Sequence, residues 1–468
     1  MPKKLGIIIT DGVGFRNFIL SNFLMEAQAT FTEVVIYSCL PKNVYQEFNL
    51  DNVKIVELEV YPDTFYTWFF LKLKETAHLQ LHKKGNFGIQ DSIRINKTFN
   101  DSTRGYAKRF IFFFTRFFHS ENWIQRFNRW QQYTFKTHPI TKGYLTLLQT
   151  DAPDFLFFTH QRPPYIAPIL YAAEQLKITT GAFIFSWDNL ASKGRMAGNF
   201  DVYFVWSDLM KQELLQFYSL VRPEQIHVVG TPQFEPYVLE RYYSSKTDFF
   251  NKFDLDPTLK TICFSCGDVS TSKNDPLYIE TIALAIQSGI LGNVNLIVRT
   301  SPAETPERFL YLKEKFPFIK WNYPKWELSR QGHQETWSQR VPTVGDIMNL
   351  RALLAFCDVF VNMCSTMSLD AICFDKPVVN PVFGNSGNEL YDDQRFLKYA
   401  HYERVVKSGA VAIAKTKEAL INAINEALEK PTLRLDKQEK LLKLQVGKSL
   451  KDTSVNFIDS IKNIILKI

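Results

Sequence analysis

CDVFVNMCSTMSLDAICFDKPVVN, residues 357–380, is the stretch that decides the fold of this chain. Its apolar residues 359–363 predict a buried strand, and a helix is expected to open at Ser365. A Lys-Pro pair ends that helix before a second apolar strand at residues 378–379. A strand, a helix and a strand in so few residues form a βαβ unit, which implies a parallel sheet with a right-handed crossover.

The start of this helix has the chemistry of an anion site. Ser365 and Thr366 are good N-cap residues. A helix N-terminus at the carboxyl end of a parallel strand attracts anions because free N–H groups and the helix dipole point at the same place. Asp370, on the first turns, can accept hydrogen bonds from ribose hydroxyls. These features are typical of a nucleotide-diphosphate site, and they are equally those of an ordinary cap with an Asp favoured by the dipole.

The segment resembles the donor-binding end of GT-B glycosyltransferases and of their relatives, the CDP-glycerol glycerophosphotransferases and UDP-N-acetylglucosamine 2-epimerases. The glycerophosphotransferase pattern is a small-residue pair, three variable positions, an Asp and a terminal Lys-Pro, matched here by Ser365, Thr366, Asp370, Lys376 and Pro377. Met363 and Cys364 stand where that family usually has Asp-Tyr. The resemblance implies an α/β fold of the GT-B type, two Rossmann-like domains with a cleft between them.

The preceding elements extend the expected donor domain. Residues 261–266 predict a strand that leads into a loop beginning at Gly267, and residues 293–299 predict another strand. In glycerophosphotransferases the matching motif is a basic residue, one variable residue, His and Pro, whereas Ser301 replaces the histidine here. The resemblance leaves a phosphate-binding role for Arg299. The donor-binding prediction therefore comprises Gly267, Arg299, Ser365, Thr366 and Asp370, with Asn388 in a polar loop placed to touch the donor sugar.

The amino-terminal end begins with a strand at residues 5–10, a loop with Gly12 and Gly14, and a helix expected at 17–27. The loop lacks the third glycine of a dinucleotide fingerprint. Asp11 and Arg16 are expected at the carboxyl end of the first strand, where open α/β sheets bind ligands. In GT-B enzymes this loop often carries the catalytic base, while a surface turn is the alternative explanation.

Alternation of strands and helices resumes at residue 154. His160 follows the strand expected at 155–159, and the strand expected at 180–186 ends in SWDNLASKG, which contains Asp188, Asn189 and Lys193. The phrases SWDN, SKG and GTPQF resemble those of bacterial surface-polysaccharide proteins. A lone His is more often structural, so Asp188 and Lys193 rank above His160, and the predicted general base is Asp11 or Asp188.

Two segments interrupt the pattern. Residues 61–145 form an insertion that contains the aromatic and basic run 108–130, KRFIFFFTRFFHSENWIQRFNRW. This run suits a helix at a membrane surface, and it suits a core helix equally well. Nucleic-acid binding has no further support in the chain. Residues 316–340 form a tryptophan-bearing excursion that is long enough to be a binding loop.

Composition sets the class of protein. The chain has 468 residues, enough for two domains, with 46% hydrophobic and 22% charged residues, so it is globular. Its net charge of +7 suits anionic small molecules or an anionic membrane face better than nucleic acid. No targeting segment or apolar run of about 18 residues is visible, and the six cysteines suit free thiols, so a cytoplasmic protein is expected, with the inner membrane face as a second location.

The expected domains are residues 1–233 for the acceptor, a connection at 234–257, residues 258–450 for the nucleotide donor, and a final helix at 451–468 that crosses back to the first domain. The predicted function is transfer of a sugar from a nucleotide-diphosphate donor to a cell-surface polysaccharide or lipid-linked acceptor, with no metal or other cofactor. A glycerophosphotransferase, a sugar-nucleotide 2-epimerase and a non-catalytic GT-B binding or assembly protein remain open.

Overall fold

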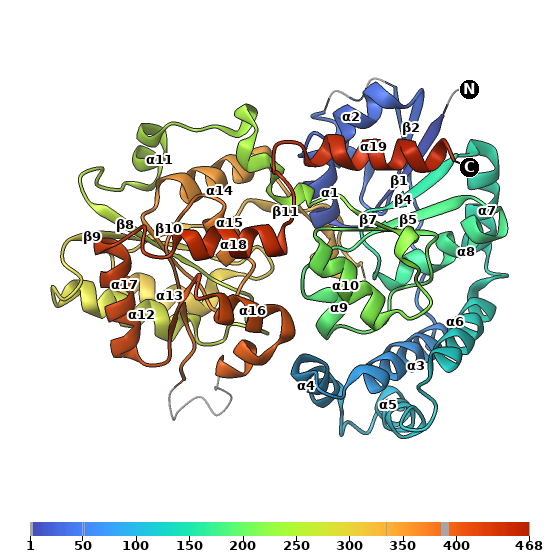
Figure 1. Cartoon of the computed structure of the whole chain (residues 1–468), viewed down its shortest axis with the longest axis horizontal. Helices are drawn as coiled ribbons and strands as arrows, with labels where there is room; N and C mark the ends of the chain where they lie inside the picture. Colours follow the sequence, from blue (N-terminus) through green and yellow to red (C-terminus); the bar gives the residue numbers. More distant parts are fainter. Residues whose placement is uncertain (1–2, 49, 51, 334, 385–392, 468) are drawn as a thin grey trace. The chain divides into compact units, whose positions relative to one another are not determined.

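The chain forms two compact units in the computed structural model, which describes residues 3–48, 50, 52–333, 335–384 and 393–467 (Figure 1). Unit 1 comprises Met1–Gln233, Ser329–Gln339 and Gln445–Ile468, and unit 2 comprises Phe234–Leu328 and Arg340–Leu444. These groupings differ from the expected segments in three places. Residues 329–339 and 445–450 belong to unit 1, and residues 234–257 belong to unit 2.

Unit 1 is built on a seven-stranded parallel sheet of order β3-β2-β1-β4-β5-β6-β7. Its strands are β1 (Lys4–Ile9), β2 (Glu33–Ser38), β3 (Val53–Glu57), β4 (Phe155–Phe158), β5 (Thr179–Phe183), β6 (Val202–Val205) and β7 (Ile226–Val228). The central strands β1 and β4 are apolar and buried, as expected of parallel strands with helices on both faces. The order reverses between β1 and β4, which makes their carboxyl ends the place where such sheets bind ligands.

The helices of unit 1 include one from the far end of the sequence. They are α1 (Gly12–Ile19), α2 (Phe23–Thr30), α3 (Phe65–His82), α4 (Phe87–Asn96), α5 (Thr103–Phe114), α6 (Glu121–Phe135), α7 (Pro139–Asp151), α8 (Ala167–Gln175), α9 (Asn189–Ser192), α10 (Asp208–Phe217) and α19 (Thr453–Ile465). Phe457 of α19 is fully buried against Phe18 of α1, Phe23 of α2 and sheet residues such as Phe157. The C-terminal helix is therefore part of the core of unit 1.

Unit 2 has a second parallel sheet, of order β10-β9-β8-β13-β14-β15. Its strands are β8 (Lys260–Ser265), β9 (Val294–Arg299), β10 (Lys320–Asn322), β13 (Val359–Val361), β14 (Val378–Pro381) and β15 (Ala412–Ala414), beside an antiparallel pair, β11 (Trp326–Leu328) and β12 (Arg340–Pro342). Its helices are α11 (Lys246–Phe253), α12 (Asp275–Gln287), α13 (Leu310–Lys315), α14 (Val344–Phe356), α15 (Met367–Ile372), α16 (Ala400–Ser408), α17 (Lys417–Glu429) and α18 (Leu435–Gln445). Two doubly wound parallel sheets confirm the predicted fold class.

The first helix begins earlier than predicted. The expected loop around Gly12 and Gly14 is the first turn of α1, because Asp11 caps that helix directly after β1. The predicted helix at 17–27 is wrong in its boundaries, since α1 ends at Ile19 and α2 begins at Phe23. The Ser21 hydroxyl accepts the Phe23 N–H at 3.2 Å, and this local bond competes with continuous helical pairing.

The regular secondary structure of the insertion at 61–145 consists of helices, α3 to α7. Leu73 and Ala77 of α3, Ile111 of α5, and Ile124 and Phe127 of α6 form its own apolar core. In the part of the chain that the structure describes, no helix is long and apolar enough to cross a bilayer.

Candidate active site

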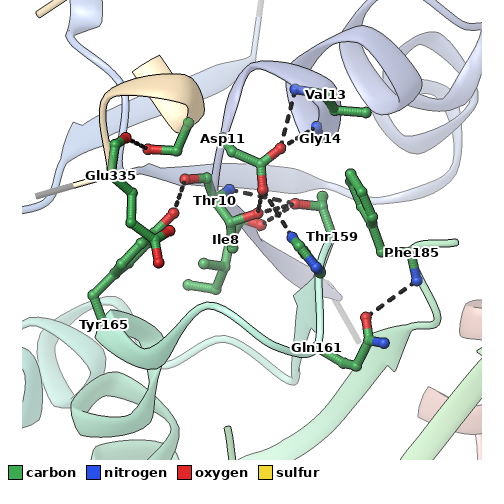
Figure 2. A network of polar contacts seen from close by, with 12 residues as sticks. Ile8, Thr10, Asp11, Val13, Gly14, Thr159, Gln161, Tyr165, Phe185 and Glu335 are labelled. Carbon is green, nitrogen blue, oxygen red and sulfur yellow. Dashed lines mark hydrogen bonds and ion pairs between the residues drawn. The ribbon is translucent and has the colours of Figure 1, made fainter. Parts of the chain in front are cut away.

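A buried Asp-His pair stands at the reversal point of the unit 1 sheet. Asp11 follows β1 and His160 follows the neighbouring strand β4, and the Asp11 Oδ2 lies 2.9 Å from the His160 Nδ1. Figure 2 shows the Asp11 carboxylate beside Thr10, Val13 and Gly14. The Asp11 side chain is fully buried and also accepts hydrogen bonds from the Val13 and Gly14 N–H groups at 3.0 and 2.8 Å and from the Thr10 hydroxyl at 2.9 Å. Each oxygen of the Asp11 carboxylate thus has two hydrogen-bond partners.

The protonation states follow from these contacts. Burial raises the pKa of Asp11, but the hydrogen bond and charge of His160 together with the Gly14 and Thr10 donors lower it more, so the carboxyl group is ionised. Burial lowers the pKa of His160, and Asp11 offsets only part of this effect. The imidazole is therefore neutral near pH 7. Since a carboxylate only accepts, the His160 Nδ1 carries the proton and the Nε2 has the free lone pair.

Neighbouring loops hold the imidazole in place. The His160 ring stacks on Phe185 at 3.9 Å between centroids. Gln161, the next residue, accepts the Phe185 N–H at 3.1 Å and donates to the Asn189 side chain at 3.0 Å. Asn189 in turn donates to Asp188 at 3.2 Å. The ends of β4 and β5 are thereby connected by side-chain hydrogen bonds, which fix the orientation of the ring.

Asp188 and Lys193, predicted to share one polar loop, form an ion pair at 3.4 Å. The charge of Asp188 also contributes to the pKa of His160, raising it, so the carboxylate belongs to the same electrostatic site. Arg16 lies half-buried on α1 rather than in a loop. The structure thus brings Asp11, His160, Asp188, Asn189 and Lys193 together at the carboxyl edge of one sheet.

Glu335 is a site residue that sequence reasoning missed. It belongs to the segment Ser329–Gln339, which returns to unit 1 between β11 and β12. Burial, together with the negative charge of Asp11, raises its pKa, which Arg162 and Lys72 partly offset. Tyr165, whose hydroxyl donates to the Thr10 carbonyl at 2.9 Å, lies beside it in Figure 2. The only signal in the sequence was the length of the tryptophan-bearing excursion.

The expected phosphate site in unit 2 lies at the end of β13. The Ser365 N–H donates to the Asn362 side chain at 3.1 Å, and the Ser365 hydroxyl accepts the Met367 N–H at 3.2 Å. Thr366 occupies the N-cap position of the short helix α15 without a side-chain cap bond. Asp370 is buried and accepts a hydrogen bond from the Tyr237 hydroxyl. Asn388 lies outside the described residues.

Arg299 and Gly267 are both engaged within unit 2. The buried guanidinium of Arg299 donates to Asn322 and forms an ion pair with Asp346 at 2.8 Å. Its charge is therefore balanced by the protein, and its role at a phosphate stays a prediction. The Gly267 N–H donates to Asp275 at 2.9 Å, and a Cβ at this position would clash with the Ser272 hydroxyl. No cluster of three metal-ligating side chains occurs among the described residues.

Comparison with known proteins places the fold. No family model and no curated protein sequence matches the chain. Among solved structures, the UDP-GlcNAc 2-epimerase of Neisseria meningitidis aligns with a TM-score of 0.54 at 11% identity, covering 98% of this chain and 100% of that one. S. aureus MnaA with UDP aligns with a TM-score of 0.54 at 12% identity, covering 100% of this chain and 98% of that one. A glycosyltransferase of Rickettsia africae aligns with a TM-score of 0.53 at 12% identity, covering 100% of this chain and 99% of that one. The chain therefore has the GT-B architecture shared by these epimerases and glycosyltransferases.

Proposed function

We propose that the protein is a nucleotide-sugar-dependent glycosyltransferase in which His160 is the general base. The observation that carries this proposal is the 2.9 Å bond between the His160 Nδ1 and the buried Asp11 carboxylate. This bond leaves a neutral imidazole whose Nε2 can accept a proton. The predicted base Asp11 is reassigned as a positioning residue because its two oxygens already receive four hydrogen bonds.

In the proposed reaction an acceptor hydroxyl attacks the anomeric carbon of the donor sugar. The new carbon–oxygen bond forms, the bond from the anomeric carbon to the diphosphate oxygen breaks, and the nucleoside diphosphate leaves with the bonding electrons. His160 takes the hydroxyl proton at Nε2, and the adjacent Asp11 carboxylate stabilises the imidazolium that results. The acceptor in this proposal is a glycan or a lipid-linked sugar used in surface polysaccharide synthesis.

The donor site is proposed in unit 2, at the end of β13. The Thr366 N–H group would face the diphosphate and Asp370 the ribose, with Gly267 at the end of the adjacent strand β8. The epimerase of Neisseria meningitidis bound to UDP-GlcNAc and S. aureus MnaA with UDP have the same fold, which supports a nucleotide diphosphate as ligand. When the ribose binds, the Asp370 carboxylate would either accept hydrogen bonds from both the ribose and the Tyr237 hydroxyl or lose its hydrogen bond with Tyr237.

A sugar-nucleotide 2-epimerase is the second candidate, and Glu335 is the observation that favours it. Glu335, with a raised pKa, interacts electrostatically with Asp11, the partner of the neutral His160 imidazole, so the site holds an acid and a base, which removal and return of a proton at one carbon require. NMR of UDP-GlcNAc alone in heavy water distinguishes the two functions. Epimerisation exchanges the sugar C2 hydrogen for deuterium, whereas a transferase leaves C2 protonated and releases UDP only by transfer or slow hydrolysis.

The first test is the His160→Ala variant with a nucleotide sugar found by thermal shift. Transfer should fall by roughly 10²–10⁴-fold, the contribution of a positioned general base, while the nucleotide-induced rise in melting temperature is retained. His119→Ala changes a half-buried histidine in the loop between α5 and α6; it is the matched control and should keep wild-type activity. Unchanged transfer by folded His160→Ala would remove the assignment of the base.

A further inference from the structure

The outward faces of helices α3, α5 and α6 and the turn that follows α5 expose an unusual number of aromatic side chains. The exposed residues, with the fraction of each side chain open to solvent, are Tyr66 (67%), Tyr106 (59%), Phe110 (52%), Phe113 (60%), Phe117 (68%) and Tyr133 (64%). The opposite side of the same helices is core, with Ile111, Ile124 and Phe127 at 0–1%. The aromatic run at 108–130 therefore serves both purposes that the sequence left open, a packed core and an exposed surface.

Several of these rings contact one another or neighbouring aromatic side chains. Phe113 contacts Phe117 at 5.7 Å between centroids, and Phe110 lies 6.3 Å from Phe69 of α3. Tyr66, Phe70, Trp130 and Tyr133 line a shallow apolar depression between α3 and α6. Figure 1 shows α5 at the outer edge of this helical group, away from the seven-stranded sheet. An exposed apolar patch of this kind marks an interaction surface.

The charge around the patch is mainly positive, and the exposed Asp101 pairs with one of its cations, Arg109, at 3.2 Å. Residues 103–120 contain Arg104, Lys108, Arg109 and Arg116 and no Asp or Glu. On α6, Arg126 and Arg129 are exposed, while the single acidic residue of that helix, Glu121, is paired with Arg195 at 2.6 Å. The guanidinium of Arg109 lies over the Tyr106 ring at 4.3 Å, which keeps the cation at the level of the aromatic surface.

We propose that this aromatic–basic face, formed by Tyr66, Tyr106, Phe110, Phe113, Phe117 and Tyr133 with the surrounding arginines, docks on an anionic lipid membrane. Bulky apolar rings bury themselves at the boundary of headgroups and acyl chains, and arginines bind the lipid phosphates. The helix α5, with 12 residues, is too short to span a bilayer and suits a position parallel to the surface. The proposal is independent of the reaction proposed above.

The test is co-sedimentation with vesicles of phosphatidylcholine alone or mixed with phosphatidylglycerol, at about 0.15 M salt. The whole 468-residue chain should bind the mixed vesicles and bind pure phosphatidylcholine much less. Phe110→Ser/Phe113→Ser/Phe117→Ser should weaken binding by at least roughly tenfold, since three rings that enter the membrane are lost. A matched triple, Leu284→Ser/Leu310→Ser/Tyr311→Ser, changes exposed apolar residues of unit 2 and should bind as the wild type does.

A second variant tests the charges without altering the aromatic rings. Arg104→Gln/Arg116→Gln/Arg129→Gln should reduce binding to phosphatidylglycerol and flatten its dependence on salt. Circular dichroism checks that each variant is folded. The proposal is overturned if the wild type does not bind anionic vesicles, or if both the phenylalanine variant and the arginine variant bind them as the wild type does. It is also overturned if light scattering shows a wild-type dimer that the phenylalanine variant abolishes, because the face then binds a second copy of the chain.

Discussion

His160 and Asp11 show how one short bond assigns two chemical roles. A carboxylate that is fully buried and bonded to two backbone N–H groups, a hydroxyl and an imidazole has no lone pair directed at a substrate. The same hydrogen bond fixes the tautomer of His160 and influences the pKa of its imidazole. The pH dependence of the reaction should report it.

We therefore expect kcat/KM to rise with pH through a single acidic limb below pH 6.5, because burial lowers the pKa of His160 and only the neutral ring is a base. Asp11 offsets part of that effect by raising the pKa of His160. In Asp11→Asn the limb should accordingly move to still lower pH, together with a lower maximal rate because the ring orientation is lost. A limb that moves to higher pH in this variant would contradict the pairing.

At the scale of elements, α14 joins the ends of two strands through one carboxylate. Asp346, in its first turn, forms the 2.8 Å ion pair with Arg299 at the end of β9 and accepts the Lys325 N–H at 3.1 Å and the Trp326 indole N–H at 3.0 Å. Asp346 is about as buried as any residue of the sheet. The pair therefore stabilises the geometry of unit 2 before any ligand is bound.

Arg299→Ala should consequently destabilise unit 2 by about 3–5 kcal/mol, the cost of leaving a buried partner charge uncompensated. Urea unfolding followed by fluorescence measures this loss. In the double variant Arg299→Met/Asp346→Leu part of the loss should be recovered, because no lone charge remains buried. Nucleotide affinity of Arg299→Ala should be measured only under conditions where unit 2 is folded, since unfolding and lost phosphate binding otherwise look alike.

The helix α19 gives a second prediction at this scale. Phe457 is fully buried and packs on Phe18, Phe23, Phe157 and Phe204, all from the first 233 residues. Phe457→Ala should cost unit 1 about 3–5 kcal/mol, as large-to-small changes in a packed core do. Val455→Ala, on the exposed side of the same helix, is the control and should cost less than about 1 kcal/mol. Equal effects of the two changes would mean that α19 is not part of the core.

At the scale of the whole molecule, hydrophobic patterning predicted parallel sheets, whereas the two-domain GT-B class was predicted from the resemblance of residues 357–380. Strands buried on both faces, such as β1 and β13, are short apolar runs, and their alternation with helices predicts parallel sheets. Patterning missed β3, an edge strand whose residues Lys54 and Glu57 are polar and exposed. It also missed Glu335. Residues 329–339 return to unit 1 through tertiary contacts, and such contacts produce no periodic hydrophobic pattern in the sequence.

The candidate site was predicted only in part, for the same physical reason. Asp11, His160 and Asp188 were identifiable because carboxyl ends of parallel strands gather at one edge. Their proposed roles could not be predicted, because the proposal that Asp11 positions His160 rests on an N-cap that occupies one of the Asp11 oxygens. A lone histidine acquires a chemical role only through a partner 149 residues away.

The distribution of buried ionisable groups gives a prediction for the whole chain. Burial lowers the pKa values of His160, His82, His227 and His333, and that of His78 well below its usual value, and all five lie in unit 1. A histidine with a depressed folded-state pKa contributes stability that is present above its unfolded pKa of about 6.5 and is lost as the pH falls toward the folded-state value. The five histidines should therefore make unit 1 lose stability on acidification below pH 6.5, against the smaller opposing contribution of Glu335, whose pKa is raised.

Unit 2 should behave in the opposite way. Burial raises the pKa of Asp275 well above its usual value, although Arg308 opposes this shift. A carboxyl group with a raised pKa is stabilising below its unfolded pKa, and that contribution is lost as the pH rises through the folded-state value, so unit 2 gains stability as the pH falls. Calorimetry at pH 7.5 and pH 5.5 should accordingly show the melting transitions of the two units moving apart.

Two variants assign this separation to individual side chains. His78 is fully buried, and both of its ring nitrogens lack a hydrogen-bond partner among the described residues, so His78→Phe should make the pH dependence of the unit 1 transition shallower. The expected change in slope is at most about 1.4 kcal/mol per pH unit, the effect of one proton. Asp275→Asn should do the same for unit 2. If the His78→Phe transition follows the wild-type pH dependence, the buried ring is not what makes unit 1 sensitive to acid.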